Sequence, residues 1–521
     1  MDNVNRRLHL VCGGLALAAC FLGGPSAASP PEVRIKQGAL RGLEADGVSV
    51  FRGIPFAAPP VEGLRWRPPQ PAPAWSGVRD ALVAGNDCLQ SSSVHAVDPS
   101  GRPVSEDCLY LNVWSPERRE RLPIIVWIHG GGFVTGSGAR GMTDGRSLAQ
   151  RGVVVVSINY RLGRLGFFAH PLLTAEAPEA PLANYGLMDQ IAALEWVRDN
   201  IASFGGDSDN VTLMGESAGG ASVNFLMASP AARGLFHKAI VISGGGRTIP
   251  PAYTPDLRRR SPDGHPSAEQ IGEAALARAG RWPRTAAELR ATPWEALRLP
   301  PEAGMSGTVS FPGVVVDGRV VTAPVAEAFA RGEAMVIPYL IGANDAEGIL
   351  FADQPGRIEQ ALSAFGDQRA AIERAYGDRR TARRHLGGDV VFVEPARHLA
   401  RLMRDRGAPV RVYRFGYVAE SLRARLAGLP HAYSLPYFFD RLEASTLPAS
   451  AADSAVATLT ADYVAAFARA GDPNGEGRVR WPEFGSDESL LFIESTGVRA
   501  GDDPTRARLD LVEAAALRLV R

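Results

Sequence analysis

A serine in the local sequence of a nucleophile lies at position 217. Residues 215–219 read Gly-Glu-Ser-Ala-Gly; an apolar run at 211–214 precedes them and the small-residue segment 218–223 follows. In this pattern a strand turns sharply into a helix, which lifts the serine hydroxyl clear of the sheet and leaves no room for a Cβ on either glycine. The chemistry indicated is acyl transfer through Ser217.

The pattern alone is weak, because a chain of 521 residues with 56 glycines should contain roughly a third of a match by chance. The apolar run before the turn and the small residues after it favour a nucleophile over an ordinary glycine-rich turn. Such a serine also needs a base, an acid that orients the base, and donors for the oxyanion. In α/β-hydrolases the order along the chain is Ser, then the acid, then His.

Two carboxylates follow the apolar run 336–342, which predicts a strand. Asp345 and Glu347 share the loop at the end of this strand, and either can orient a histidine. Spacing does not choose between them, and a solvated loop charge is the alternative interpretation for each.

Of the histidines that follow, His431 is the strongest candidate for the base. It lies in the irregular loop 428–433, beyond a strand predicted over 410–418, where an imidazole can project back over the sheet. His398 falls within a run with helical periodicity and many arginines, and His385 follows two arginines in a charged stretch. Both are therefore expected on the protein surface.

The oxyanion donors are expected in residues 129–133, His-Gly-Gly-Gly-Phe, directly after the apolar run 124–128. Consecutive glycines let backbone N–H groups converge on one oxygen, and the N–H of Ala218 completes the set. A flexible loop or a phosphate-binding loop is the alternative, but neither a P-loop lysine nor a dinucleotide-binding G-x-G-x-x-G motif accompanies it. All four parts occur in the required order at predicted strand ends, which indicates a serine acyl hydrolase.

The elements that position these residues follow an α/β pattern. Residues 186–204 repeat apolar side chains at helical spacing, while the alternating segment 33–50 predicts antiparallel strands near the N-terminus. Continuous apolar runs, typical of strands covered on both faces, occupy 109–114, 124–129, 153–158, 211–214 and 239–243. Strands that alternate with helices predict a central, mostly parallel, twisted sheet.

One domain is expected over residues 29–521, with helical insertions at about 247–310 and 356–407, because no internal repeat or low-complexity linker divides the chain. The 56 basic and 56 acidic residues cancel, which argues against the basic footprint of a nucleic-acid-binding protein. No motif indicates a cofactor or a metal ion. The charge balance is compatible with a small neutral substrate.

The first 28 residues resemble an export signal. Arg6 and Arg7 precede an apolar stretch at 8–22 that is too short for a spanning helix, and residues 25–28 suit signal peptidase. Lipoprotein processing is the alternative, since Leu-Ala-Ala-Cys at 17–20 resembles a lipobox that would make Cys20 a lipid-anchored N-terminus. We expect an exported protein, periplasmic or secreted, without a membrane span.

Cys88 and Cys108 are the cysteines that remain once this signal is removed. An even pair in an exported chain predicts one disulfide, which contributes about 3 kcal/mol on the loop-entropy model. Two buried free thiols are the alternative.

Further motifs resemble those of the type-B carboxylesterase family, which contains para-nitrobenzyl esterases, lipases of the cholinesterase type and acetylcholinesterase. Phe-Gly-Gly-Asp at 204–207, together with the turn around Ser217, resembles one signature of this family. Glu-Asp-Cys-Leu-Tyr-Leu-Asn-Val at 106–113 resembles the other. Other segments that resemble the family lie at 51–60, 159–161, 184–190 and 471–474. The resemblance covers nearly the whole mature chain and implies an α/β-hydrolase fold that hydrolyses carboxylic esters.

The resemblance also implies roles for individual residues. In this family the orienting acid is followed by glycine, which selects Glu347, and His431 matches the base. The residues that match the oxyanion donors are Gly131, Gly132 and Ala218. The resemblance further implies a disulfide between Cys88 and Cys108, whose loop forms one side of the entrance to the active-site gorge. It also implies two ion pairs, Arg65–Glu106 and Arg161–Asp189.

The chain departs from the family at Ser434, three positions after His431, where an acidic residue is usual. Because no triad member is lost, we expect a difference in how the His431 loop is held or in the shape of the pocket beside it.

Two other functions are compatible with parts of this pattern. A non-catalytic binding or adhesion protein on the same fold would lack a triad residue, whereas this chain lacks none. Cleavage of thioesters, lactones or amides, or acyl transfer to another acceptor, would use the same residues, because the pocket walls decide the substrate. The sequence does not identify which ester is the substrate.

Overall fold

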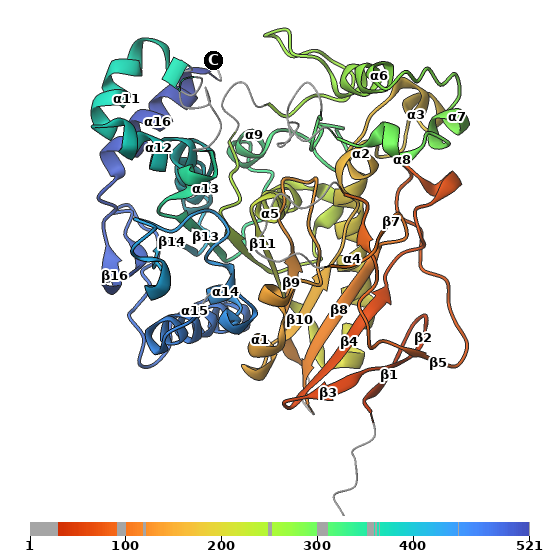
Figure 1. The fold of residues 1–521 in the computed structure, drawn as a ribbon, viewed down its shortest axis with the longest axis horizontal. Helices are drawn as coiled ribbons and strands as arrows, with labels where there is room; N and C mark the ends of the chain where they lie inside the picture. Colours follow the sequence, from red (N-terminus) through yellow and green to blue (C-terminus); the bar gives the residue numbers. More distant parts are fainter. Residues whose placement is uncertain are drawn as a thin grey trace, which may run out of the picture.

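Eleven strands of the described residues pair into one large sheet in the computed structural model (Figure 1). The structure describes residues 30–90, 101–117, 121–247, 253–299, 311–351, 359, 362–363, 365–445 and 448–519. In sheet order the strands are β16 (Gly497–Gly501), β15 (Leu490–Glu494), β14 (Val410–Gly416), β13 (Tyr339–Asn344), β12 (Lys238–Ile242), β11 (Gly206–Glu216), β9 (Leu122–Ile128), β10 (Val154–Ile158), β8 (Tyr110–Pro116), β4 (Val48–Pro55) and β3 (Leu43–Ala45).

Neighbouring strands from β10 to β15 run parallel, and antiparallel pairs flank them at both ends of the sheet. The predicted antiparallel strands near the N-terminus are confirmed: β3 pairs with β4, and β1 (Glu32–Ile35) pairs with β2 (Gly38–Arg41). Short strands complete two small sheets, namely β5 (Val78–Asp80), β6 (Asp87–Cys88) and β7 (Val104–Ser105). The parallel centre places the C-terminal ends of its strands along one edge.

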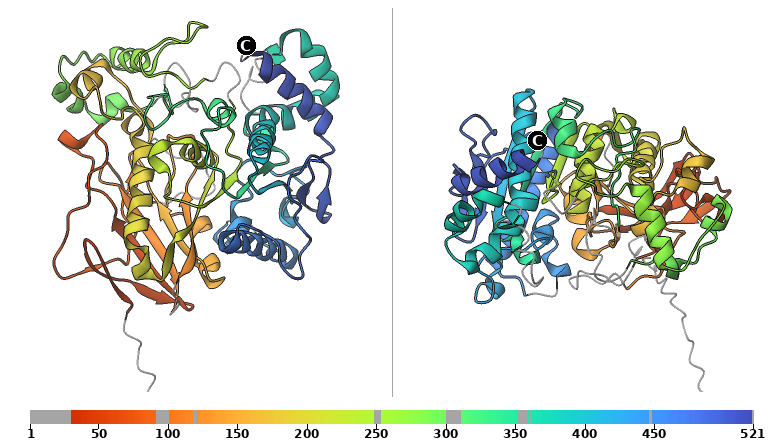
Figure 2. Two further views of the ribbon diagram at one scale, coloured as in Figure 1. Left: turned by 180° about the vertical axis from the view of Figure 1, so that it is seen from behind. Right: turned by 90° about the horizontal axis from the view of Figure 1, so that it is seen from above.

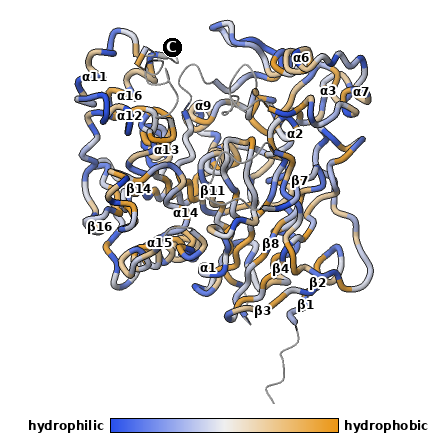
Figure 3. The backbone as a smooth tube through the Cα atoms, viewed as in Figure 1, coloured by the Kyte–Doolittle hydropathy of each residue, from blue (hydrophilic) through white to orange (hydrophobic). Residues whose placement is uncertain are grey.

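The central strands are apolar on both faces because helices cover both. All residues of β9 are buried: Ile124, Val126 and Ile128 join the hydrophobic core on one face, and Ile125 and Trp127 join the core on the other. Successive side chains of a strand point to opposite faces, so a strand covered on both reads as a continuous apolar run. Figure 3 shows hydrophobic segments in the interior and hydrophilic ones at the outer loops and helices.

Two helical layers enclose the sheet (Figure 2). Helices α4 (Tyr185–Asn200), α5 (Ala218–Ala228) and α13 (Glu394–Asp405) pack on the first face. Helices α1 (Arg146–Gln150), α14 (Leu435–Phe438) and α15 (Ala451–Ala470) belong to the core on the second face. Other helices outside these two groups include α2 (Gly163–Gly166), α3 (Pro171–Glu176), α9 (Val325–Ala330) and α16 (Arg506–Leu519).

Helices also occupy the two segments that were expected to interrupt the sheet. The first contains α6 (Ala268–Arg278), α7 (Ala286–Arg290) and α8 (Trp294–Leu297). The second contains α11 (Arg369–Tyr376), α12 (Arg379–Gly388), a π-helical turn (Asp389–Val393) and α13. The expected export signal at 1–28 lies outside the described residues. No helix in the described ranges has the length and apolar character needed to cross a membrane.

Covalent and ionic links join distant parts of the chain. Cys88 and Cys108 form the predicted disulfide, with a sulfur–sulfur distance of 2.09 Å. The implied ion pairs are also present: Arg65 Nε lies 2.7 Å from Glu106 Oε2, and Arg161 Nε lies 2.8 Å from Asp189 Oδ2. The side chains of the second pair are only 4% and 0% exposed, so each charge depends on the other.

Candidate active site

Ser217 makes the turn between strand β11 and helix α5. The strand ends at Glu216, the helix begins at Ala218, and Ser217 itself has φ 54° and ψ −121°, a conformation that non-glycine residues rarely adopt. Its backbone N–H donates to the carbonyl oxygen of Ile242 on β12 at 2.9 Å. A strained turn held in this way is the arrangement that exposes a serine hydroxyl at the edge of an α/β sheet.

Close backbone contacts explain the glycines around this turn. A Cβ on Gly219 would collide with the carbonyl oxygen of Ile128 at the end of β9, and a Cβ on Gly215 would collide with the backbone of Gly219. A Cβ on Gly220 would lie 2.7 Å from the Cα of Gly244. Helix α5 therefore approaches the sheet more closely than larger residues would allow.

The glycine loop after β9 lies against the same turn. A Cβ placed on Gly130 would lie 3.0 Å from the Cβ of Ser217, while Gly131 and Gly132 have φ values of 112° and 63°. Within the described part of the chain, the N–H groups of Gly131, Gly132 and Ala218 donate no hydrogen bond. Free donors in a glycine turn and at a helix N-terminus form a site for a negatively charged oxygen.

His431 and Glu347 come together from loops at the ends of two neighbouring strands. His431 Nδ1 lies 2.5 Å from Glu347 Oε2, and both side chains are buried. The second oxygen of Glu347 accepts hydrogen bonds from the N–H of Asn344, at 2.8 Å, and from the hydroxyl of Ser243. These hydrogen bonds therefore fix the position of the Glu347 carboxylate independently of its contact with the imidazole.

The other candidate acid and histidines lie elsewhere. Asp345 accepts a hydrogen bond from the N–H of Leu429 at 2.6 Å, so it holds the loop that carries His431 without contacting the imidazole. His385 Nδ1 lies 2.8 Å from the backbone oxygen of Asp345, and His398 Nδ1 lies 3.6 Å from Glu513 Oε1. The structure thus brings Glu347, and not Asp345, to His431.

A second carboxylate beside His431 was absent from the sequence predictions. Glu216 Oε1 lies 3.2 Å from His431 Nε2, and its side chain is 4% exposed. The imidazole also stacks on Phe392, with ring centroids 4.5 Å apart. No hydrogen bond joins the Ser217 hydroxyl to Nε2 in the described structure. Glu216 stands inside the motif around Ser217 and was visible there, whereas nothing local marks Phe392.

Burial and charge act in opposite directions on these groups. Burial lowers the pKa of His431, but the carboxylates of Glu347 and Glu216 outweigh it and raise that pKa to about 9. Burial raises the pKa of Glu216 to about 7, against the attraction of His431. Burial lowers the pKa of His129 to about 3, so this imidazole, which stacks on Tyr160, is neutral. His431 is the more basic of the two histidines.

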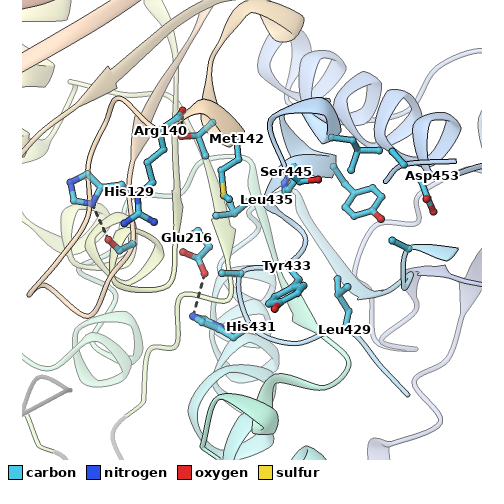
Figure 4. A pocket seen from close by; sticks show the side chains of 18 of the residues that line it. His129, Arg140, Met142, Glu216, Leu429, His431, Tyr433, Leu435, Ser445 and Asp453 are labelled. Carbon is cyan, nitrogen blue, oxygen red and sulfur yellow. Dashed lines mark hydrogen bonds and ion pairs between the residues drawn. The ribbon is translucent and has the colours of Figure 1, made fainter. Parts of the chain in front are cut away.

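A pocket borders His431 and the glycine loop (Figure 4). Most of its wall is apolar, including Trp127, Met142, Leu422, Leu429, Leu435 and Tyr437. Polar side chains gather at one end, where Arg140, Glu216 and His431 point into the same space. An apolar pocket with a few convergent polar groups is the usual form of a small-molecule site.

Ser434 is fully buried, and its hydroxyl has no hydrogen-bond partner among the described residues. Its carbonyl oxygen accepts from the N–H of Tyr437 at 3.0 Å, at the start of α14. The loop that carries His431 is held instead by Asn344, whose Nδ2 donates to the carbonyl oxygen of Pro430 at 2.7 Å, and by the Asp345 contact. The side chains of Asn344 and Asp345 therefore hold the backbone of the loop that carries His431.

Glu394, His398 and Glu513 are the described side chains close enough together to share a metal ion. Arg247 Nη1 lies 3.1 Å from Glu394 Oε1, and Arg401 pairs with Glu513. Guanidinium groups already balance these carboxylates, so the cluster is an ion-pair network.

Comparisons with known proteins agree with this geometry. Residues 29–512 match the model of the carboxylesterase family. Fumonisin B1 esterase of Sphingopyxis macrogoltabida is 36% identical, over 96% of this chain and 95% of its own, and para-nitrobenzyl esterase of Bacillus subtilis is 35% identical, over 91% and 96%. A solved structure of PNB esterase has a TM-score of 0.79 at 32% identity, over 92% of this chain and 99% of its own. This chain belongs to the carboxylesterase family, has the α/β-hydrolase fold and is a carboxylic ester hydrolase.

Proposed function

We propose that Ser217, His431 and Glu347 form the catalytic triad of this carboxylesterase and that hydrolysis proceeds through an acyl-enzyme. The observation that supports this most strongly is the 2.5 Å contact between His431 Nδ1 and Glu347, next to the strained Ser217 turn. A carboxylate bound at Nδ1 fixes the imidazole and leaves Nε2 to accept a proton. Contacts of this kind tighten when substrate binds, so the absence of a Ser217–His431 hydrogen bond is compatible with the proposal.

In the first half of the cycle His431 Nε2 accepts the proton of Ser217 as Oγ attacks the ester carbonyl. The N–H groups of Gly131, Gly132 and Ala218 stabilise the oxyanion, and the imidazolium then protonates the departing alcohol. In the second half a water molecule attacks the acyl-enzyme, with His431 again as base, and releases the carboxylic acid and free Ser217. Glu347 stays ionised throughout and stabilises the imidazolium.

Hydrolysis of para-nitrophenyl esters of increasing acyl length tests this assignment. Wild-type protein is expected to hydrolyse at least the shorter esters, and Ser217→Ala to lose about a millionfold in kcat. Ser454→Ala, at an exposed serine of α15, is the matched control and should keep wild-type rates. Full ester hydrolysis by Ser217→Ala would overturn the proposal. Thioester and amide analogues in the same assay define which acyl bonds the site accepts.

We also propose that the protein is exported. The pattern of residues 1–28 supports this, as does the Cys88–Cys108 disulfide, because disulfides persist in oxidising compartments. Lipid anchoring at Cys20 is the alternative form. The mass of the mature protein separates the two: cleavage near Ala28 gives an unmodified chain, whereas a lipid on Cys20 gives a longer, heavier one. A full-length chain retained in the cytoplasm would contradict export.

A further inference from the structure

Arg140 brings an unpaired positive charge to the pocket beside His431. It precedes the 3-10 helix η2 (Gly141–Thr143), lines the pocket, and extends toward Glu216 in Figure 4. Its Nε is buried without a hydrogen-bond partner, and no hydrogen bond or ion pair reaches its guanidinium from the described residues. A partly buried guanidinium loses hydration and regains it only through a partner of opposite charge or through water.

A neighbouring arginine on the same part of the chain shows the contrast. Arg146, at the start of α1, has its Nη1 2.9 Å from Asp46 Oδ2 and does not line the pocket. Arg151, at the end of α1, pairs with both Asp440 and Asp462. Arg140 therefore differs from nearby arginines in pointing at a cavity without an acidic partner.

No titratable group among the described residues forms an ion pair with Arg140. Burial raises the pKa of Glu216 to about 7, against the attraction of His431 and Arg140, but Glu216 Oε1 lies against His431 Nε2 and not against the guanidinium. His129 is neutral because burial lowers its pKa to about 3, and burial raises the pKa of Tyr160 well above its ordinary value, so the phenol is neutral too. At the far end of the pocket Asp453 is engaged by the hydroxyl of Tyr417 at 2.8 Å.

We propose that Arg140 binds a carboxylate carried by the ester, so that this carboxylesterase prefers esters with a free acidic group. The proposal rests on the catalytic site proposed above. Gly131 and Arg140 line the same pocket, so an ester whose carbonyl lies on the glycine loop can place a second group along the apolar wall. The guanidinium offers its N–H groups as a planar fork, which matches both oxygens of a carboxylate.

Substrate pairs with acyl chains of equal length test this preference. Mono-para-nitrophenyl adipate and para-nitrophenyl hexanoate differ by a carboxylate on the acyl side, whereas para-carboxyphenyl hexanoate and phenyl hexanoate differ by one on the alcohol side. Wild-type protein is expected to show a higher kcat/KM for the charged member of at least one pair. Which pair responds tells whether the acid or the alcohol portion of the ester faces Arg140.

Substitution assigns the preference to this residue. Arg140→Gln is expected to lower kcat/KM for the preferred charged ester by about 10- to 100-fold, chiefly through KM, and to change its neutral counterpart by no more than about twofold. Arg140→Lys keeps the charge but not the fork and should recover part of the loss. Arg146→Gln, which breaks an exposed ion pair outside the pocket, is the matched control and should behave as wild type.

Two results would overturn the role of Arg140 while leaving the triad intact. One is a wild-type enzyme whose kcat/KM is no higher for the charged member of either pair than for the neutral member. This result is obtained without any variant. The other is an Arg140→Gln protein with an unchanged Tm whose kcat/KM falls by the same factor for charged and neutral esters. Retained hydrolysis by Ser217→Ala would instead overturn the proposed catalytic site, so the two failures are distinguishable.

Discussion

The pH dependence of hydrolysis tests how two carboxylates act on His431. A general base must be neutral to accept a proton, so kcat/KM rises with pH through the pKa of the base. Glu347 and Glu216 raise the pKa of His431 to about 9 against the effect of burial, and Glu216, with a pKa raised to about 7, is itself ionised in that range. Glu216→Gln removes one of the two negative charges that raise the pKa of His431. The pKa of His431 must then fall, and the rising limb of the pH profile must move to lower pH.

The size of the shift follows from the 3.2 Å between Glu216 Oε1 and His431 Nε2. At an effective dielectric constant of about 20, unit charges at this separation interact by about 5 kcal/mol, or roughly four pKa units, which is an upper bound. Opposite charges in proteins typically shift a pKa by about one to three units. We therefore expect the limb to move down by about one to three pH units.

The assay is kcat/KM for an alkyl ester that is stable in base, from about pH 5 to pH 10. Glu443→Gln is the control, because Glu443 is 64% exposed and its Oε1 lies 2.9 Å from Arg441. This variant should follow the wild-type profile. A rising limb that stays in place in Glu216→Gln, or moves to higher pH, would refute the assignment of His431 as a base held between two carboxylates.

Three further changes test the triad and the links that hold the fold. Glu347→Gln should lower kcat by about 1,000- to 10,000-fold, because Nδ1 loses its orienting carboxylate; a loss of less than about tenfold would contradict its role. Arg161→Met leaves Asp189 buried and unpaired and should cost about 3–5 kcal/mol in chemical denaturation, whereas adding Asp189→Leu should restore part of it; additive losses would show that the pair is not coupled. Replacing Cys88 and Cys108 by Ser should lower Tm by roughly 3 °C, since the disulfide contributes about 3 kcal/mol and a chain of this length loses about 1 kcal/mol per degree; an unchanged Tm would argue against that contribution.

The buried strands are the part of the fold that local sequence predicts best. Strands β9 and β10 begin and end within about two residues of the apolar runs 124–129 and 153–158, because a strand covered on both faces is apolar along nearly its whole length. Strand β11 starts at Gly206, before the apolar run 211–214. Gly206 pairs with Leu122 of β9, and the register shifts before the next pair, Val211 and Ile124. Such pairing depends on the neighbouring strand and has no local signal.

Elements near the C-terminus were not predicted for a related reason. Helix α15 packs small side chains such as Ala457 and Ala461 in the core against β9 and β11, and its large buried apolar residues, such as Tyr463 and Phe467, are confined to its second half. Strands β15 and β16 join the end of the sheet, and the exposure of β16 leaves it without a continuous apolar run. The continuous apolar run 490–493 of β15 was visible in the sequence, whereas the places of α15 and β16 depend on tertiary packing.

The candidate site divides in the same way. The Ser217 turn and the glycine loop are backbone features, and glycine spacing records them directly. Asp345 and Glu347 share one loop, and only the packing of the His431 loop determines which carboxylate meets the imidazole. The approach of Glu216 to His431 depends on contacts between segments far apart in the chain, which spacing does not encode.

A covalent acyl group on Ser217 during turnover is the most direct test of the proposed mechanism. Wild-type protein would be mixed with a para-nitrophenyl ester, quenched with acid during turnover, digested, and examined by peptide mass spectrometry. The peptide that contains Ser217 is expected to carry the mass of the acyl group, and Ser217→Ala treated in parallel should carry none. An acyl group on a different residue, or turnover at the wild-type rate with Ser217 unmodified, would contradict the mechanism.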